Sequence, residues 1–384
     1  MHLIKNITVI IILLLLTGCI KPYDPVIDAN AENKYVVSGR ITDQEGFQEV
    51  AVSLSSPIKE PKSIPVGFCQ VNILDDKGNV FALEEYQPGQ YRVWIDQANL
   101  AAGTSYKVKV ITPTGETLES GFDKMPKCPP IDTVYYFVED VPTTDPTVTS
   151  KVMQFYVDLD AIGDYSQYYK WDIMETWEYH AAHPAQYYYD GTFHEIIPPD
   201  YSNNVCYTNN LVKNVFTIST KGLSQNTYKQ YPLHSIDGQT QRLAYLYSIL
   251  VSQVALTEQA YNYWEQLRIN SNEQGGLYEK QPLAIKGNLL NLSTPEKDVL
   301  GCFYASSVST RRYFFQHVQG IDMSFNNFCS EDPLGKFAWK EFSPDEYPVF
   351  YYFNESGYLR ILGTYCIDCR KMGGTTVKPD FWPN

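Results

Sequence analysis

Eight cysteines give this chain its most evident chemistry. Cys366 and Cys369 form a Cys-x-x-Cys pair, a spacing found in redox pairs and zinc sites. The residues flanking the pair look like loops rather than a helix start, and the sequence has no second pair with this spacing. We therefore favour structural disulfides in an oxidising compartment, and the connectivity stays open. The candidate disulfide cysteines are Cys128, Cys206, Cys329, Cys366 and Cys369.

Cys19 has a different setting, because it ends the segment Leu16-Thr17-Gly18-Cys19 after a short apolar run. A basic start, about ten apolar residues and a small residue before cysteine are typical of a lipoprotein signal peptide. We expect residues 1–18 to be removed, Cys19 to be lipidated, and residues 19–34 to form a tether. The remaining seven cysteines are an odd number, so at least one thiol should be free or paired with another chain.

Three histidines lie close together in the sequence: His180, His183 and His194. On a helix, the spacing of the first two would place both rings on one face, as many metal ligands are placed. The surrounding residues are aromatic and loop-like, Pro184 follows at once, and no His-Glu-x-x-His signature is present. We treat the three as weak metal candidates and expect exposed loop histidines, with no metal and no cofactor.

Other catalytic signatures are missing from the sequence. It contains no Gly-x-Ser-x-Gly elbow, no glycine-rich phosphate loop and no Ser-x-x-Lys motif. No pair of carboxylates can be singled out for glycoside hydrolysis. We therefore expect that this protein is not an enzyme.

Aromatic residues are concentrated between positions 165 and 189 of a chain with 31 tyrosines. Tyrosine suits half-buried sheets and also surfaces that bind sugars or peptides. Burial within a sheet is the favoured interpretation, and a loop presenting these rings to a ligand or partner is the alternative. The candidate surface consists of Trp177, Tyr179, Tyr187, Tyr188 and Tyr189.

The composition limits the class of protein. The net charge of −14 argues against nucleic acid and anionic lipid as partners, because both would be repelled. A hydrophobic share of 44% over 384 residues is ample for packed cores in two or three domains.

Alternating apolar residues predict a mainly β chain with two domains. Short strands separated by turns over 35–127 predict a β-sandwich of immunoglobulin-like or transthyretin-like type. The segment Lys127-Cys128-Pro129-Pro130 breaks this pattern, so residues 128–384 form a larger β-rich domain that ends in the cysteine segment. Within that domain, 243–256 reads as a central strand, and Thr257 to Asn272 as a helix capped by Thr257.

The order of several short motifs resembles the Bacteroidota outer-membrane lipoproteins catalogued as domain of unknown function 4249. This resemblance implies an accessory role in nutrient capture or transport beside a TonB-dependent receptor, and it assigns no catalytic residues. It implies an outer-membrane location, and loosely placed acidic residues in the tether favour the cell surface. The alternatives are a free-standing adhesin that binds glycans or peptides, and a zinc hydrolase using the three histidines. The motifs include Tyr35-Val-Val-Ser-Gly39, Ile131-Asp-Thr-Val134, Ala260-Tyr-Asn-Tyr-Trp264 and Lys378-Pro-Asp-Phe-Trp382.

Overall fold

The computed structural model describes residues 33–56, 62–145, 147–238, 240–272, 285–321, 329, 331–333 and 338–383. Strands dominate this part of the chain, which confirms the mainly β fold class. None of the described helices has the length and apolar character needed to cross a membrane. The predicted signal peptide, Cys19 and nearly all of the tether lie outside the described residues.

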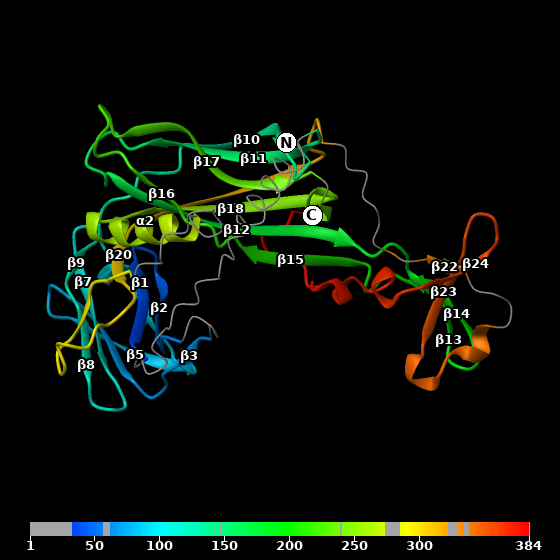
Figure 1. Ribbon diagram of the computed structural model, residues 1–384, viewed down its shortest axis with the longest axis horizontal. Coiled ribbons are helices and arrows are strands. Elements are labelled where there is room, and N and C mark those ends of the chain that lie inside the picture. The colour runs from blue at the N-terminus through cyan, green and yellow to red at the C-terminus, as the bar shows by residue number, and fades with distance from the viewer. Residues whose placement is uncertain are drawn as a thin grey trace, which may run out of the picture.

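An eleven-stranded sheet surrounds the N-terminal core (Figure 1). Its order is β19-β8-β7-β4-β5-β6-β2-β1-β20, with β3 paired to β2 and β9 to β7. Strand β5 pairs with β4 through Val80–Leu83 and with β6 through Glu84–Gln87. The sheet folds over at this strand into two halves that pack face to face, and we call this unit the sandwich. The strands are β1 (Tyr35–Thr42), β2 (Gly46–Leu54), β3 (Ile64–Pro65), β4 (Gln70–Asp75), β5 (Val80–Gln87), β6 (Gln90–Ile95), β7 (Ser105–Ile111), β8 (Thr117–Ser120), β9 (Asp123–Lys124), β19 (Leu289–Asn291) and β20 (Phe303–Ser306).

In the N-terminal strands, buried and exposed side chains alternate, so one face of each half of the sandwich packs into a shared core. Val37 and Ile41 of β1, together with Val50 and Val52 of β2, are at most 1% exposed. They pack against residues of β4 and β7, such as Val108. The period of two in the sequence therefore corresponds to burial on one side of each strand.

Two strands of this sheet come from far along the chain. Strand β20 runs parallel to β1, with Gly39 opposite Phe303, and β19 pairs with β8. Gly301 precedes β20 with a φ of 93°, and a Cβ there would lie 2.1 Å from the carbonyl oxygen of Val37. Only glycine fits this close approach. Residues 289–306 thus complete a sheet otherwise built from residues 35–124.

Two further sheets form the centre of the molecule. One has the order β10-β11-β17, and the other β15-β12-β18-β21 with β16 also on β12. Phe155, Trp171 and Tyr247 are fully buried between them. The strands are β10 (Thr133–Pro142), β11 (Thr149–Asp160), β12 (Tyr168–His180), β15 (Val205–Leu211), β16 (Phe216–Ser219), β17 (Thr227–Asp237), β18 (Leu246–Ala255) and β21 (Val308–Gln316).

Helix α2 (Glu258–Asn272) lies between the sandwich and the central sheets (Figure 1). The Thr257 hydroxyl accepts from the backbone N–H of Ala260 at 3.3 Å, so the predicted cap is confirmed. The same hydroxyl donates to Asp123 at 2.8 Å, and Asp123 also accepts from the N–H of Ala305. This cap therefore fastens the helix to β9 and β20.

A smaller distal sheet projects from the end of the molecule opposite the sandwich (Figure 1). Its order is β14-β13-β23-β24-β22. The strands are β13 (Ala185–Tyr189), β14 (Phe193–Asp200), β22 (Glu331–Pro333), β23 (Val349–Phe353) and β24 (Leu359–Leu362). Single 3₁₀ turns complete the described structure: η1 (Gln97–Asn99), η2 (Gln241–Leu243), η3 (Ala338–Glu341), η4 (Pro344–Glu346), η5 (Thr364–Cys366) and η6 (Cys369–Met372).

Candidate functional site

One face of the distal sheet is covered by aromatic rings, and we call it the distal aromatic face. Tyr187 and Tyr189 of β13 share this face because they are two residues apart. Their register partners on β23 are Tyr351 and Val349, and Tyr189 also lies opposite Phe193 of β14. The face consists of Tyr187, Tyr189, Phe193, Trp339, Tyr347, Tyr351 and Phe353.

The rings of this face pack against one another, with Trp339 at the centre. Its ring centroid lies 4.9 Å from Tyr189, 5.0 Å from Phe193 and 5.2 Å from Tyr351. Tyr351 is buried, whereas Phe193 is 59% and Phe353 51% exposed. Rigid aromatic side chains that are partly exposed and already ordered are well suited to anchoring a partner protein.

Tyr188 points to the opposite face of the same strand. Its ring stacks on His194 at 4.6 Å, and it also contacts Phe350. Tyr188 therefore contributes to a different surface from its two neighbours, as the alternation of a strand requires.

Trp177 and Tyr179 lie on β12, away from the distal sheet. Tyr179 is 2% exposed, and its hydroxyl donates to the carbonyl of Cys369 at 2.9 Å. Trp177 packs against the central core, with the guanidinium of Arg242 5.4 Å from its ring centroid. The structure thus separates the five predicted surface residues into three environments. The physical reason is that β12 ends at His180, and the chain enters a new sheet before Tyr187.

The three histidines are also separated, and each has its own carboxylate. His180 pairs with Glu178 at 2.7 Å, His183 with Glu331 at 3.2 Å, and His194 with Asp190 at 2.9 Å. The structure does not bring them together as one ligand set.

A different group, made of His183, Cys329 and Glu331, has ligand atoms within 4.8 Å of one another. Cys329 is bonded to Cys366 and so offers no thiolate to a metal ion. In this oxidised form the group holds only an imidazole and a carboxylate as ordinary metal ligands.

Two disulfides fix the C-terminal segment. Cys206 of β15 bonds to Cys369, and Cys329 bonds to Cys366. The Cys-x-x-Cys pair therefore splits between two bridges, one on the central sheet and one beside the distal sheet. Cys206, Cys366 and Cys369 are all buried.

Cys128 was a candidate for one of these bridges, and this prediction is wrong. Within the part of the chain that the structure describes, Cys69, Cys128 and Cys302 are free thiols. Cys128 lies at the junction before β10, where its sulfur contacts the carbonyl of Gln253 at 3.3 Å. Burial raises the pKa of the Cys128 thiol to about 12, so it is an unreactive packing residue.

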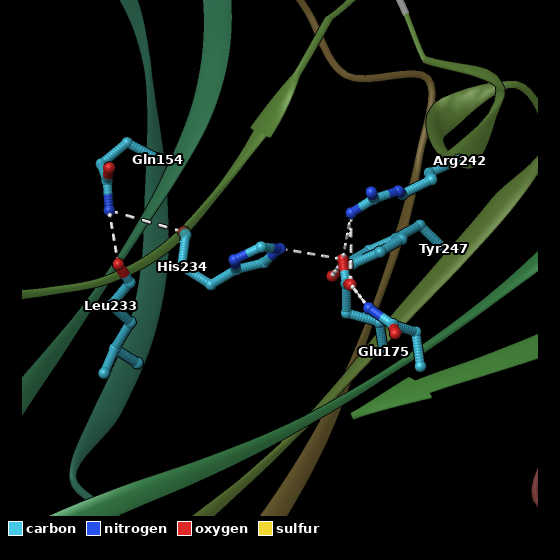
Figure 2. Close-up of polar contacts among 7 residues, drawn as sticks. Gln154, Glu175, Leu233, His234, Arg242 and Tyr247 are labelled. Atoms are coloured by element: carbon cyan, nitrogen blue, oxygen red, sulfur yellow. Dashed lines mark hydrogen bonds and ion pairs between the residues drawn. The ribbon is translucent and has the colours of Figure 1, made fainter. Parts of the chain in front are cut away.

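A buried carboxylate lies between the two central sheets (Figure 2). Glu175 is fully buried on the face of β12 that also carries Ile173 and Trp171. Four side chains donate to it from three other strands and η2: His234 at 3.0 Å, Arg242 at 3.2 Å, Tyr247 at 2.9 Å and Asn210 at 2.8 Å.

These partners determine the protonation of Glu175. Burial alone would raise its pKa, but the bond and charge of His234, the bond from Asn210 and the charge of Arg242 together lower the pKa to about 2. The carboxylate stays ionised at neutral pH. Because it is fully buried and bonded on both oxygens, it joins β12 to β17 and β18 rather than facing a substrate.

Sequence reasoning missed this centre, although a signal was present. Residues 169, 171 and 173 of β12 are apolar or aromatic inward-facing positions, and Glu175 continues the same parity. A charged residue at a core position needs partners, which could have been sought among the later strands. The partners of Tyr187 and Tyr189 carried no comparable signal, because Trp339 and Tyr351 are remote in the sequence.

Comparison with known proteins gives a family but no function. A comparison with curated proteins found no match to this chain. A crystal structure of a Salmonella alpha-2-macroglobulin mutant shows 10% sequence identity and a TM-score of 0.19, with 58% of this chain and 14% of that one covered. The family model described as a domain of unknown function, DUF4249, matches residues 20–312. This match includes the sandwich, β13, β14 and the central sheets as far as Arg312 of β21. The chain therefore belongs to the DUF4249 family.

Proposed function

We propose that this protein is a lipid-anchored outer-membrane accessory protein, facing the cell surface, that works with a TonB-dependent receptor in nutrient capture. The distal aromatic face is the docking surface for that receptor. The observation that carries this proposal is the exposure of packed aromatic rings on the distal sheet. Figure 1 shows that this sheet lies at the end of the molecule opposite the sandwich.

The position of the anchor supports this orientation. The tether at residues 19–34 leads directly into β1 of the sandwich. Fully extended, such a segment spans up to roughly 50 Å, so the sandwich end stays within that reach of a lipidated Cys19. The distal sheet then faces away from the attachment point, where a partner can reach it.

The chemistry of the face suits a protein partner. Phe193 and Phe353 supply exposed apolar area, and Tyr187 adds a phenol. Partial burial and the nearby Glu195 raise the pKa of Tyr187, so its hydroxyl stays protonated and neutral. Exposed aromatic anchors surrounded by polar groups are characteristic of interface centres.

The test is recovery of the receptor from native outer membranes. Full-length protein with an affinity tag after the C-terminal residue is solubilised gently, and copurifying proteins are identified by mass spectrometry. We expect one TonB-dependent receptor in stoichiometric amount. Phe193→Ser and Phe353→Ser together should reduce its recovery at least about tenfold, because anchor residues dominate binding energy.

The matched control is Leu290→Ser, which alters a 66% exposed apolar side chain on β19 of the sandwich. It should leave recovery unchanged. Recovery of the lipoprotein alone would overturn the accessory role and favour a free-standing adhesin. Equal loss with the Leu290→Ser variant would overturn the assignment of the docking surface.

A further inference from the structure

A cavity of about 430 Å³ lies between the sandwich and α2, away from the distal aromatic face. Its floor is the outer face of β1 and β2, and one wall is the helix. The lining residues that matter here are Ser38, Arg40, Glu49, Ala51, Tyr263 and Trp264. Its volume is within the range of about 300–1,000 Å³ found for small-ligand sites.

The strand register explains why the surface is hollow at this point. Ser38 of β1 lies opposite Ala51 of β2, and Ala51 lies opposite Gln90 of β6. The first two residues of this row have small side chains. The next row has Arg40 opposite Glu49, and both side chains are long. Small residues beside long ones leave a depression, which Tyr263 and Trp264 enclose from the helix side.

The charges in the cavity are balanced. The guanidinium of Arg40 donates to Asp172 at 2.8 Å, and Asp172 also pairs with Lys170, whose ammonium lies 4.0 Å from the ring centroid of Trp264. Glu49 is opposite Arg40 on one neighbouring strand and opposite Arg92 on the other, and Arg92 is in turn opposite Glu84. Glu49 would repel an anionic ligand and Arg40 would repel a cationic one, so the cavity favours a ligand without net charge.

The hydrogen-bonding groups of the cavity further restrict the class of ligand that it can bind. A guanidinium only donates, a carboxylate only accepts, and Arg40 has five N–H groups. Glu49 accepts from the Tyr86 hydroxyl at 3.3 Å, which leaves most of its acceptor capacity for a ligand. Hydroxyl groups both donate and accept, so a polyhydroxylated ligand can use both residues. The rings of Tyr263 and Trp264 offer apolar surface for the C–H groups of such a ligand.

We infer that this cavity binds a neutral saccharide of roughly one to three units. Arg40 and Glu49 bind its hydroxyls, and the aromatic wall packs against a sugar ring. This site goes beyond the proposed receptor docking, because it lies on other elements and uses no residue of the distal aromatic face.

Calorimetric titration tests the inference. Full-length protein is purified in a polyoxyethylene detergent, which carries no sugar headgroup. The probes are neutral trisaccharides of glucose, mannose, galactose and xylose, with a galacturonate trisaccharide and zwitterionic dipeptides as rivals. We expect at least one neutral trisaccharide to bind, and the charged and zwitterionic probes to bind at least about tenfold more weakly.

Variants locate the binding. Ala51→Trp, and separately Ser38→Trp, fill the hollow from an outward-facing position and should weaken binding at least about tenfold while thermal unfolding stays cooperative. Glu49→Gln should weaken it severalfold. The matched control is Glu84→Gln, because Glu84 is exposed on the same outer face opposite Arg92 but does not line the cavity.

Three results would overturn the inference. They are the absence of binding by every neutral trisaccharide, binding of dipeptides in preference to saccharides, and undiminished saccharide binding in both filled variants. None of these depends on receptor recovery, so failure of the saccharide site and failure of the docking proposal can be told apart.

Discussion

The central sheets and the distal sheet reach order by different means. The centre buries large side chains such as Trp171 and Phe155 on both sides of one core, and four donors satisfy the buried carboxylate of Glu175. The distal sheet leaves Phe193 and Phe353 about half exposed and has a disulfide beside it. Burial stabilises the first region, whereas the second region combines one disulfide, Cys329–Cys366, with packed aromatic rings that stay partly exposed.

The largest effect is expected from removing the bridge that ties the C-terminal segment to the central sheet, because it tests whether burial alone is sufficient there. Replacing Cys206 and Cys369 together by Ala opens a loop with a sequence separation of 163. The chain-entropy model gives a loss of about 5 kcal/mol in the free energy of unfolding. Chemical denaturation measures it, and a loss below about 1 kcal/mol would show that packing alone holds the C-terminal segment.

Substitution of the buried carboxylate Glu175 tests how the central sheets are stabilised. Glu175→Gln should lower the free energy of unfolding by roughly 3 kcal/mol at pH 7, because it leaves Arg242 without its buried counter-charge and removes a carboxylate oxygen that accepts from His234 and Tyr247. Denaturant unfolding of the variant beside Glu84→Gln, whose side chain is exposed, provides the measurement and its control. Equal stability of the two variants would contradict a stabilising role for the centre.

The same residue predicts a pH dependence. The folded pKa of Glu175 is about 2, below its ordinary value of 4.5. Its contribution to stability is therefore complete above pH 4.5 and is lost as the pH falls toward 2. Thermal unfolding from pH 6 to pH 2 should show a steeper loss in the native protein than in Glu175→Gln. Parallel curves would exclude this residue as a source of acid sensitivity.

Substitution of Tyr351 tests whether the distal sheet opens separately from the central sheets. Tyr351→Ala removes a buried ring that contacts Tyr187 and Trp339, and should cost about 2 kcal/mol. Hydrogen exchange should show the lost protection in β13 and β23 while β18 remains protected, because local openings need not involve the central core. Uniform loss across all sheets would mean that the two regions unfold as one unit.

The smallest effect on stability is expected at Phe193. Its side chain is 59% exposed, so Phe193→Ser should change the free energy of unfolding by less than about 0.5 kcal/mol. Denaturant unfolding checks this value, and a buried partner for comparison is Phe155→Ser in the central core. A large loss in the Phe193→Ser variant would show that the exposed rings are needed for folding and not only for contact.

Local patterns in the sequence were sufficient to predict most of the individual strands of the sandwich and the helix. Alternating residues predicted β1, β2, β4, β5, β6 and β7 but not the short β3. The apolar run at 243–256 predicted the central strand β18, and Thr257 predicted the start of α2. Cys206 was correctly among the possible partners of the C-terminal cysteines. These features depend on residues near one another or on chemistry limited to a few side chains.

The remaining features depend on contacts between distant segments. Nothing in the short segment at residues 303–306 indicated pairing with β1, and nothing near Tyr187 indicated Tyr351 as its register partner. Glu175 was detectable as a misplaced charge, but its four donors were not. A strand pattern gives the parity of a residue and not the identity of the strand beside it.

The pairing of β20 with β1 has a consequence for the order of synthesis. Residues 35–124 leave the ribosome first, yet one edge of β1 remains unpaired until Phe303 follows. During that time the backbone N–H of Val37 and Gly39 must be hydrated or shielded, because their acceptors at Leu300 and Cys302 have not yet been made. The first strand of the described chain is thus among the last to acquire both neighbours.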